Sequence, residues 1–135
     1  MESEPWVIGQ LTLAEFVRYA GASGDFNPVH FDPAVAAKIG APTVFGHGML
    51  SAGLLASYLS TWVGREHIRR IRFRFNDRLW PEDVIIATGR CLSVSRSVGW
   101  LEADLEASLT AQGGTTKAVA TCQVSSSDFE ADIPQ

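Results

Sequence analysis

The segment GMLSAGLLASYLSTWV at positions 48–63 restricts the possible folds more than any other part of this chain. It is long enough for a helix but too short to span a membrane, and small and apolar residues lie on all sides of that helix. A helix that is hydrophobic all round is stable when other parts of the chain bury it. The remaining residues are therefore expected to form a layer that wraps around one central helix.

This layer is predicted to begin at position 68, where the hydrophobic period changes. Ile71, Phe73 and Phe75 alternate with arginines, which is the two-residue repeat of a strand with one buried face. Four strands are expected, at residues 68–75, 84–95, 98–110 and 115–124, joined by turns that contain Pro81, Ser97-Val98-Gly99 and Gly113-Gly114. Because consecutive strands with tight turns pair with one another, we expect a bent antiparallel sheet around the helix, an α+β fold.

The amino-terminal part is predicted to add one strand and two helices. A short strand at residues 6–8 precedes a helix at residues 13–20, which begins with a capping box formed by Thr12 and Glu15. A second, short helix is expected at residues 33–39, because an Asp-Pro pair opens it and a glycine and a proline stop it.

Composition predicts one globular domain. The chain has 135 residues, of which 46% are hydrophobic and 19% charged, as is typical of a single folded domain. A formal charge of −4, without a basic run other than the arginines at 65–78, argues against nucleic-acid binding. No signal peptide or membrane span is evident. We expect a soluble cytoplasmic protein with one domain at residues 1–124 and a polar, flexible tail at 125–135.

The two cysteines indicate no redox or metal chemistry. Cys91 and Cys122 lie in apolar, strand-like sequence without CxxC spacing or a neighbouring His/Cys cluster. We interpret both as buried free thiols. Because the sequence also has no nucleotide-binding loop and no flavin motif, no metal and no cofactor are expected.

The loop SGDFNPVH carries an acid and a base five positions apart, Asp25 and His30. Pro28 fixes its own φ and keeps Asn27 out of the helical region, while Gly24 permits backbone angles that other residues avoid. Such a turn can aim both side chains at one point near solvent. Taken alone, an Asp and a His in one loop are more often a turn cap and a structural histidine than a catalytic pair.

The order of a capped helix, SGDFNPVH, a short helix, an HGML helix and antiparallel strands resembles the MaoC-like hydratases. These are (R)-specific enoyl-thioester hydratases and dehydratases of the hot dog fold. The resemblance covers about residues 5–124. The segment YAGASGD is similar to the corresponding sequence in catalytic subunits of actinobacterial 3-hydroxyacyl-carrier-protein dehydratases. It implies a single hot dog domain that catalyses reversible syn hydration of trans-2-enoyl thioesters, on coenzyme A or a carrier protein, in fatty-acid metabolism.

The resemblance also assigns the catalytic roles. Asp25 and His30 match the pair that holds one water beside the β-carbon, and the amide of Gly48 matches the donor to the thioester oxygen. The residue types fit, since histidine titrates near neutrality and a helix amino terminus carries partial positive charge.

Other residues near the motif are expected to support the loop or to have no chemical role. Gly24, Asn27 and Pro28 should shape the turn, with Asn27 bonding to nearby backbone and bracing His30. Some relatives have a serine near the catalytic Asp, but the matching position is Ala56, so that role is not assigned. His47 is expected to be structural.

Arg70 and Arg72 have two interpretations. They form the solvated face of a strand, or they contact the phosphate or acidic groups of coenzyme A or a carrier protein.

Two further functions stay open. One is a hot dog acyl-CoA thioesterase, and the other is the catalytic subunit of a heterodimeric acyl-carrier-protein dehydratase. Because a single hot dog unit leaves a sheet edge open, we expect a homodimer or a heterodimer with another hot dog subunit.

Overall fold

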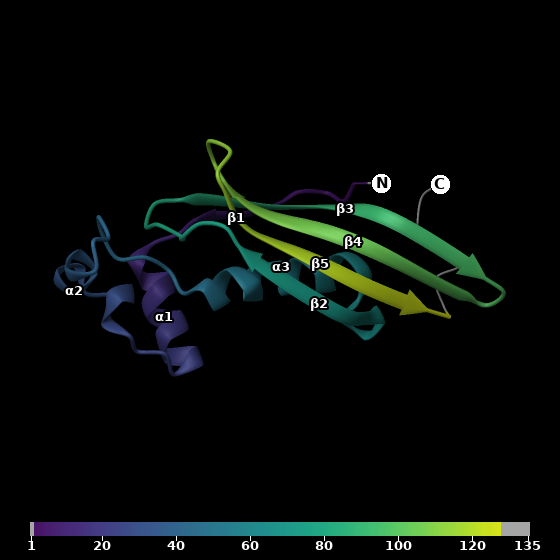
Figure 1. Cartoon of the computed structure of the whole chain (residues 1–135), viewed down its shortest axis with the longest axis horizontal. Helices are drawn as coiled ribbons and strands as arrows, with labels where there is room; N and C mark the ends of the chain where they lie inside the picture. Colours follow the sequence, from purple (N-terminus) through teal and green to yellow (C-terminus); the bar gives the residue numbers. More distant parts are fainter. Residues whose placement is uncertain (1, 128–135) are drawn as a thin grey trace.

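The computed structural model describes residues 2–127 and places a five-stranded antiparallel sheet over one long helix (Figure 1). The strand order in the sheet is β1-β3-β4-β5-β2. The strands are β1 (Trp6–Gln10), β2 (Ile68–Phe75), β3 (Val84–Ser97), β4 (Trp100–Ala111) and β5 (Thr116–Ser126). The helices are α1 (Leu13–Ser23), α2 (Pro33–Lys38) and α3 (Gly48–Val63), with 3-10 turns η1 (Pro28–His30) and η2 (Arg65–His67). The predicted α+β fold, with its bent sheet and central helix, is confirmed.

The core forms between α3 and the inner face of the sheet. Leu55 and Leu59 of α3 are fully buried, and alternate residues of β4 and β5 face them, among them Leu105, Leu109 and Ala120. This alternation follows from the two-residue period of a strand. Within the described part of the chain, no helix combines the length and apolar character needed to cross a membrane.

Several elements are longer than predicted. Helix α1 continues past Ala20 to Ser23, because Gly21 accepts helical geometry and only Gly24, with a φ of 73°, provides the left-handed C-cap. Strands β1 and β3 also extend two residues beyond their predicted ends, to Gln10 and Ser97, and β4 begins two residues later than predicted, at Trp100.

The carboxyl-terminal end of the sheet also differs from the prediction. Strand β5 ends at Ser126 instead of Val124, since Ser125 pairs with Glu102 of β4 and its hydroxyl accepts a hydrogen bond from Arg69 Nε at 2.7 Å. Residues 128–135 of the predicted tail lie outside the described residues.

Both cysteines are free, as predicted, but they differ in burial. Cys122 lies on the inner face of β5, where burial raises the pKa of its thiol to about 11. Cys91 is only half-buried and lies where the register of β3 shifts, between Cys91 and Ser93. The prediction that Cys91 is buried is therefore wrong.

A buried lysine fixes the connection between β2 and β3. Lys117 Nζ lies 2.8 Å from Asp77 Oδ2 and 3.0 Å from Asp83 Oδ2. Burial opposes the lysine charge, but the hydrogen bonds that Lys117 donates to the two carboxylates outweigh it and raise the pKa of Lys117, while the bond from Lys117 lowers the pKa of Asp77. The same connection contains Leu79, whose carbonyl accepts from the amide of Gly46 at 2.8 Å. The segment that leads into α3 is thus tied to the sheet.

Candidate active site

The loop between α1 and η1 is shaped by its own side chains. After Gly24 ends the helix, Asp25 Oδ1 accepts from the amide of Asn27 and Asn27 Oδ1 accepts from the amide of Val29, both at 3.2 Å. Pro28 then opens the η1 turn with its fixed φ. These short-range contacts form a tight turn of the main chain, with Asp25 on one side of the turn and His30 on the other.

His30 is buried and its ring orientation is set by the main chain. Its Nδ1 lies 2.7 Å from the carbonyl oxygen of Phe45, so Nδ1 carries the proton and donates, which leaves a lone pair on Nε2. The residue is 7% exposed, whereas the side chain of Asp25 is 55% exposed. The expectation that both side chains lie near solvent therefore fails for His30. Asn27 was expected to brace His30, but its side chain bonds within the loop. The carbonyl oxygen of Phe45 is the hydrogen-bond partner of His30 instead.

The reactive atoms of the pair are separated by a gap that suits a water molecule. His30 Nε2 lies 3.9 Å from Asp25 Oδ2, which is too long for a direct hydrogen bond. One water can contact both atoms at about 2.8 Å each, because a polar separation of this size is commonly bridged. A water held in this way would lie next to the free lone pair of His30 Nε2.

A third side chain, His47, belongs to the same cluster. Its ring is 3% exposed and stacks on the ring of His30, with centroids 3.6 Å apart and planes 25° apart. Its Nε2 lies 2.9 Å from the carbonyl oxygen of Asp25. Sequence reasoning expected only a structural role for this residue. The sequence feature that could have indicated a place for His47 in the site is its position directly before Gly48 in the HGML motif.

Asp25, His30 and His47 together have the composition of a metal site, with ligand atoms within 4.8 Å of one another. The geometry does not fit that use. Imidazole lone pairs lie in the ring planes, so stacked rings direct them side by side instead of toward a common point. Nε2 of His47 is also engaged by a carbonyl oxygen. The cluster fits acid–base chemistry.

The amino terminus of α3 lies beside this cluster, since Gly48 follows His47 directly. The side chain of His47 makes no cap hydrogen bond to the helix, so it does not compete for the amide of Gly48; the amide of Leu50 donates to the carbonyl of His47. A Cβ atom at Gly48 would lie 3.8 Å from the ring of Phe75. Phe75, Met49 and Phe26 are exposed here and give the surroundings of the cluster an apolar surface.

The comparisons with known proteins agree with this geometry. The model of the MaoC like domain matches residues 7–99, which is more than half of the chain. This chain belongs to the MaoC-like dehydratase family. Its fold resembles that of the (R)-hydratase from A. caviae involved in PHA biosynthesis, with a TM-score of 0.78 and 25% identity over 92% of each chain. The predicted hot dog fold is therefore confirmed.

Two mycobacterial proteins are also similar to this MaoC-like chain. The 3-hydroxyacyl-thioester dehydratase X of Mycobacterium tuberculosis is 44% identical over 48 residues, which cover 36% of this chain and 17% of that relative. The ChsH1-ChsH2 complex from Mycobacterium tuberculosis shares the fold, with a TM-score of 0.79 and 20% identity over 93% of this chain and 95% of the other. The chain spans less than a fifth of the length of the curated relatives that it matches.

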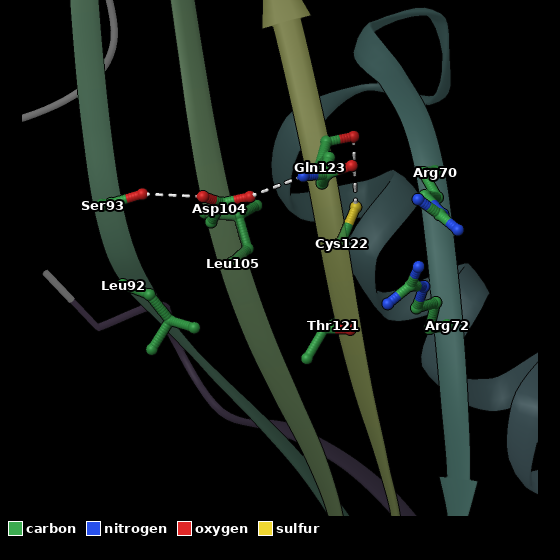
Figure 2. A pocket seen from close by; sticks show the side chains of 9 residues that line it. All are labelled: Arg70, Arg72, Leu92, Ser93, Asp104, Leu105, Thr121, Cys122 and Gln123. Carbon is green, nitrogen blue, oxygen red and sulfur yellow. Dashed lines mark hydrogen bonds between the residues drawn. The ribbon is translucent and has the colours of Figure 1, made fainter.

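Arg70 and Arg72 are not brought together with Asp25 and His30. Ile71 packs against the core, so the neighbouring arginines of β2 project from the opposite face of the sheet. Figure 2 shows them beside β5, where they line a groove of ≈ 470 Å³ on that outer face. The groove is also lined by Leu92, Ser93, Asp104, Thr121 and Gln123, and it touches Leu105 and Cys122, which are buried in the core.

Arg78 lies near the cluster, although the arginines at 65–78 could not be ranked from the sequence. Its guanidinium carbon is 4.3 Å from the ring centroid of Phe45. Phe45 in turn meets the ring of His30 edge to face, with centroids 5.4 Å apart. One aromatic ring therefore separates this exposed cation from the proposed base.

Proposed function

We propose that this MaoC-like domain catalyses the reversible syn hydration of trans-2-enoyl thioesters to (R)-3-hydroxyacyl thioesters, with Asp25 and His30 activating one water. The observation that carries this proposal is the 3.9 Å separation between His30 Nε2 and Asp25 Oδ2, at a histidine whose Nδ1 already donates to Phe45. Both groups can contact the same water, and the lone pair on Nε2 is free to accept its proton.

The atoms of one water complete the reaction. As the water oxygen adds to the β-carbon, Nε2 of His30 takes a proton, and a proton is returned to the α-carbon from the same side. Because both additions come from the face on which Asp25 and His30 hold the water, the product is the syn adduct. Dehydration follows the same steps in reverse, so the site serves either direction.

Negative charge develops on the thioester oxygen during the addition, and the amide of Gly48 is proposed to stabilise it. This amide stands at the first position of α3, where the helix dipole adds partial positive charge. Loss of one such donor typically lowers the rate by ~10²–10³. Gly48 would thus contribute about as much as a general base.

We further propose that the substrate is carried by coenzyme A or a carrier protein, and that a second hot dog subunit completes the site. Strand β2 lies at an edge of the sheet, and apolar residues next to the cluster, Phe26, Met49 and Phe75, are exposed. The structurally similar ChsH1-ChsH2 and HadBC proteins of Mycobacterium tuberculosis are complexes, which favours such pairing in a homodimer or heterodimer.

The test uses the purified protein with crotonyl-CoA, following loss of the enoyl absorbance and resolving the product by chiral analysis. Formation of (R)-3-hydroxybutyryl-CoA, abolished in Asp25→Asn, is the expected result. Release of free thiol would instead indicate a thioesterase. If crotonyl-CoA is unchanged, the assay is repeated with longer enoyl chains on a carrier protein, and inactivity on every substrate, with and without a hot dog partner subunit, overturns the proposal.

A further inference from the structure

We propose that His47 is a positioning residue for the hydration chemistry: it fixes Asp25 through the main chain and His30 through ring stacking. This inference rests on the proposed function and adds a residue to the same site. It is argued from contacts that connect three parts of the chain, the loop after α1, the η1 turn and the entry to α3.

The first contact anchors the exposed member of the pair. The carbonyl oxygen of Asp25 can only accept, so Nε2 of His47 donates to it across 2.9 Å. The other hydrogen bonds of Asp25 in the described structure involve Ser23 and Asn27, which are close neighbours in sequence. His47 is the contact that ties this loop to a buried side chain.

The second contact fixes the plane of the base. A single hydrogen bond from Nδ1 of His30 to Phe45 holds one corner of the ring but permits rotation about the bond. Stacking on His47, with centroids 3.6 Å apart, restricts that rotation and fixes the direction of Nε2. Both anchors lie in the segment 45–47, which the hydrogen bond between Gly46 and Leu79 holds in place.

The tautomer of His47 follows from its partners. Nε2 donates, and the buried Nδ1 has no hydrogen-bond partner among the described residues, so the proton of the neutral ring lies on Nε2. A neutral ring also suits the chemistry, because two imidazolium rings stacked at 3.6 Å would repel each other when His30 accepts a proton. An apolar side chain could fill this space without an unsatisfied nitrogen, and the contact with Asp25 explains why a histidine stands here.

Nuclear magnetic resonance of the wild-type imidazole nitrogens tests the arrangement without any measurement of activity. We expect the Nδ1–H tautomer for His30 and the Nε2–H tautomer for His47, with slow exchange of the latter proton. In His47→Leu we expect His30 to show a mixture of tautomers. An Nδ1–H tautomer or a cationic ring for His47 in wild type, or an unchanged His30 spectrum in His47→Leu, overturns the inference.

Kinetics of two variants separate positioning from packing. His47→Leu should lower kcat by about 10²-fold, the loss expected from misplacing reacting groups, with KM changed by less than about threefold. His47→Gln keeps a donor near the position of Nε2 and should recover at least about tenfold of that loss. His67→Leu, a histidine of η2, is the matched control and should retain wild-type kcat.

The outcomes are separable. Equal losses in the Leu and Gln variants, or wild-type kcat in His47→Leu, overturn the positioning role. If neither variant folds, as judged by circular dichroism, the wild-type tautomers decide. An inactive wild type that shows the expected tautomers would reject the proposed function while leaving the geometric assignment of His47 supported.

Discussion

The main chain at Gly46 passes so close to Phe16 of α1 that a Cβ atom there would lie 2.8 Å from a ring carbon. The same atom would lie 3.0 Å from Cβ of Leu79. Phe16 and Leu79 are both fully buried, so neither can move aside without disturbing the core. Gly46 also separates Phe45, the partner of His30, from His47. Close packing at Gly46 therefore fixes the positions of Phe45 and His47, the two residues that contact His30.

Gly46→Ala should destabilise the protein and impair turnover together. Overpacking of a well-filled core typically costs ~1–3 kcal/mol. Denaturant unfolding measures the change in free energy, and Gly53→Ala on α3 is the control, since a Cβ atom there has nothing within 4 Å. Gly53→Ala should stabilise by roughly 0.4–1 kcal/mol. Equal unfolding midpoints for the two variants would contradict the packing argument.

Asp25→Asn should abolish most turnover while leaving stability within about 0.5 kcal/mol, because the side chain is 55% exposed and Asn keeps an oxygen for the amide of Asn27. Steady-state kinetics and an unfolding curve on the same sample check both parts. A rate similar to wild type would remove Asp25 from the mechanism.

His30→Ala should lose turnover and also stability. His30 is buried, and its removal leaves the carbonyl of Phe45 without its donor, a defect that costs ~1–3 kcal/mol. Comparing its unfolding midpoint with that of Asp25→Asn distinguishes the two positions. If the two midpoints coincide, His30 is less important for packing than its burial indicates.

Most of the fold could be predicted from the sequence because periodicity reports local environment. The alternation in β2 identified that strand and its buried face, whereas the apolar segment 48–63 identified α3 but not which of its faces is buried. The end of α1 was missed because Gly21 is compatible with a helix, so only the conformation of Gly24 marks the true end. Within the site, the loop with Asp25 and His30 carried its own motif. The role of His47 depends on contact with a carbonyl 22 positions away, which its place in the HGML motif does not reveal.

The stability contributed by Glu15 should depend on pH below about 4.5. The hydroxyl of Thr12, followed by its amide, donates to the Glu15 carboxylate and lowers its pKa from 4.5 to about 2. Since the folded-state pKa is the lower one, this stabilisation is present above pH 4.5 and is lost as the pH falls toward 2.

Thr12→Ala should therefore cost about 0.5–2 kcal/mol at pH 7 and clearly less at pH 2. Unfolding free energies measured from pH 7 to pH 2 check this. Thr61→Ala, whose hydroxyl donates to the carbonyl of Ser57 within α3, is the control and should show a cost that does not vary with pH. A constant cost for Thr12→Ala would contradict the capping contact.

Arg78→Glu should raise KM for a coenzyme A or carrier-protein substrate several-fold with little change in kcat, because Arg78 stacks on Phe45 beside the proposed base. Arg72→Glu places the same charge change on the outer face of the sheet. If Arg72→Glu raises KM more than Arg78→Glu, the carrier docks on the outer face, in agreement with the second of the two interpretations of Arg70 and Arg72, contact with the carrier, and not with the first, a solvated strand face.

Lys117 holds the connection between β2 and β3 in place, so this connection should not tolerate an insertion. Lengthening residues 76–83 would separate Asp77 from Asp83, release Leu79 from Gly46 and so disturb Asp25 and His30 from a distance. The turn between β3 and β4, with Val98 fully exposed, lies at the end of the sheet opposite α1 and α2 (Figure 1). An inserted epitope or fluorescent reporter at Val98 would cost little more than loop-closure entropy, about 0.6 kcal/mol for each doubling of length. That hairpin is the site at which to graft a handle onto this MaoC-like domain without disturbing its candidate active site.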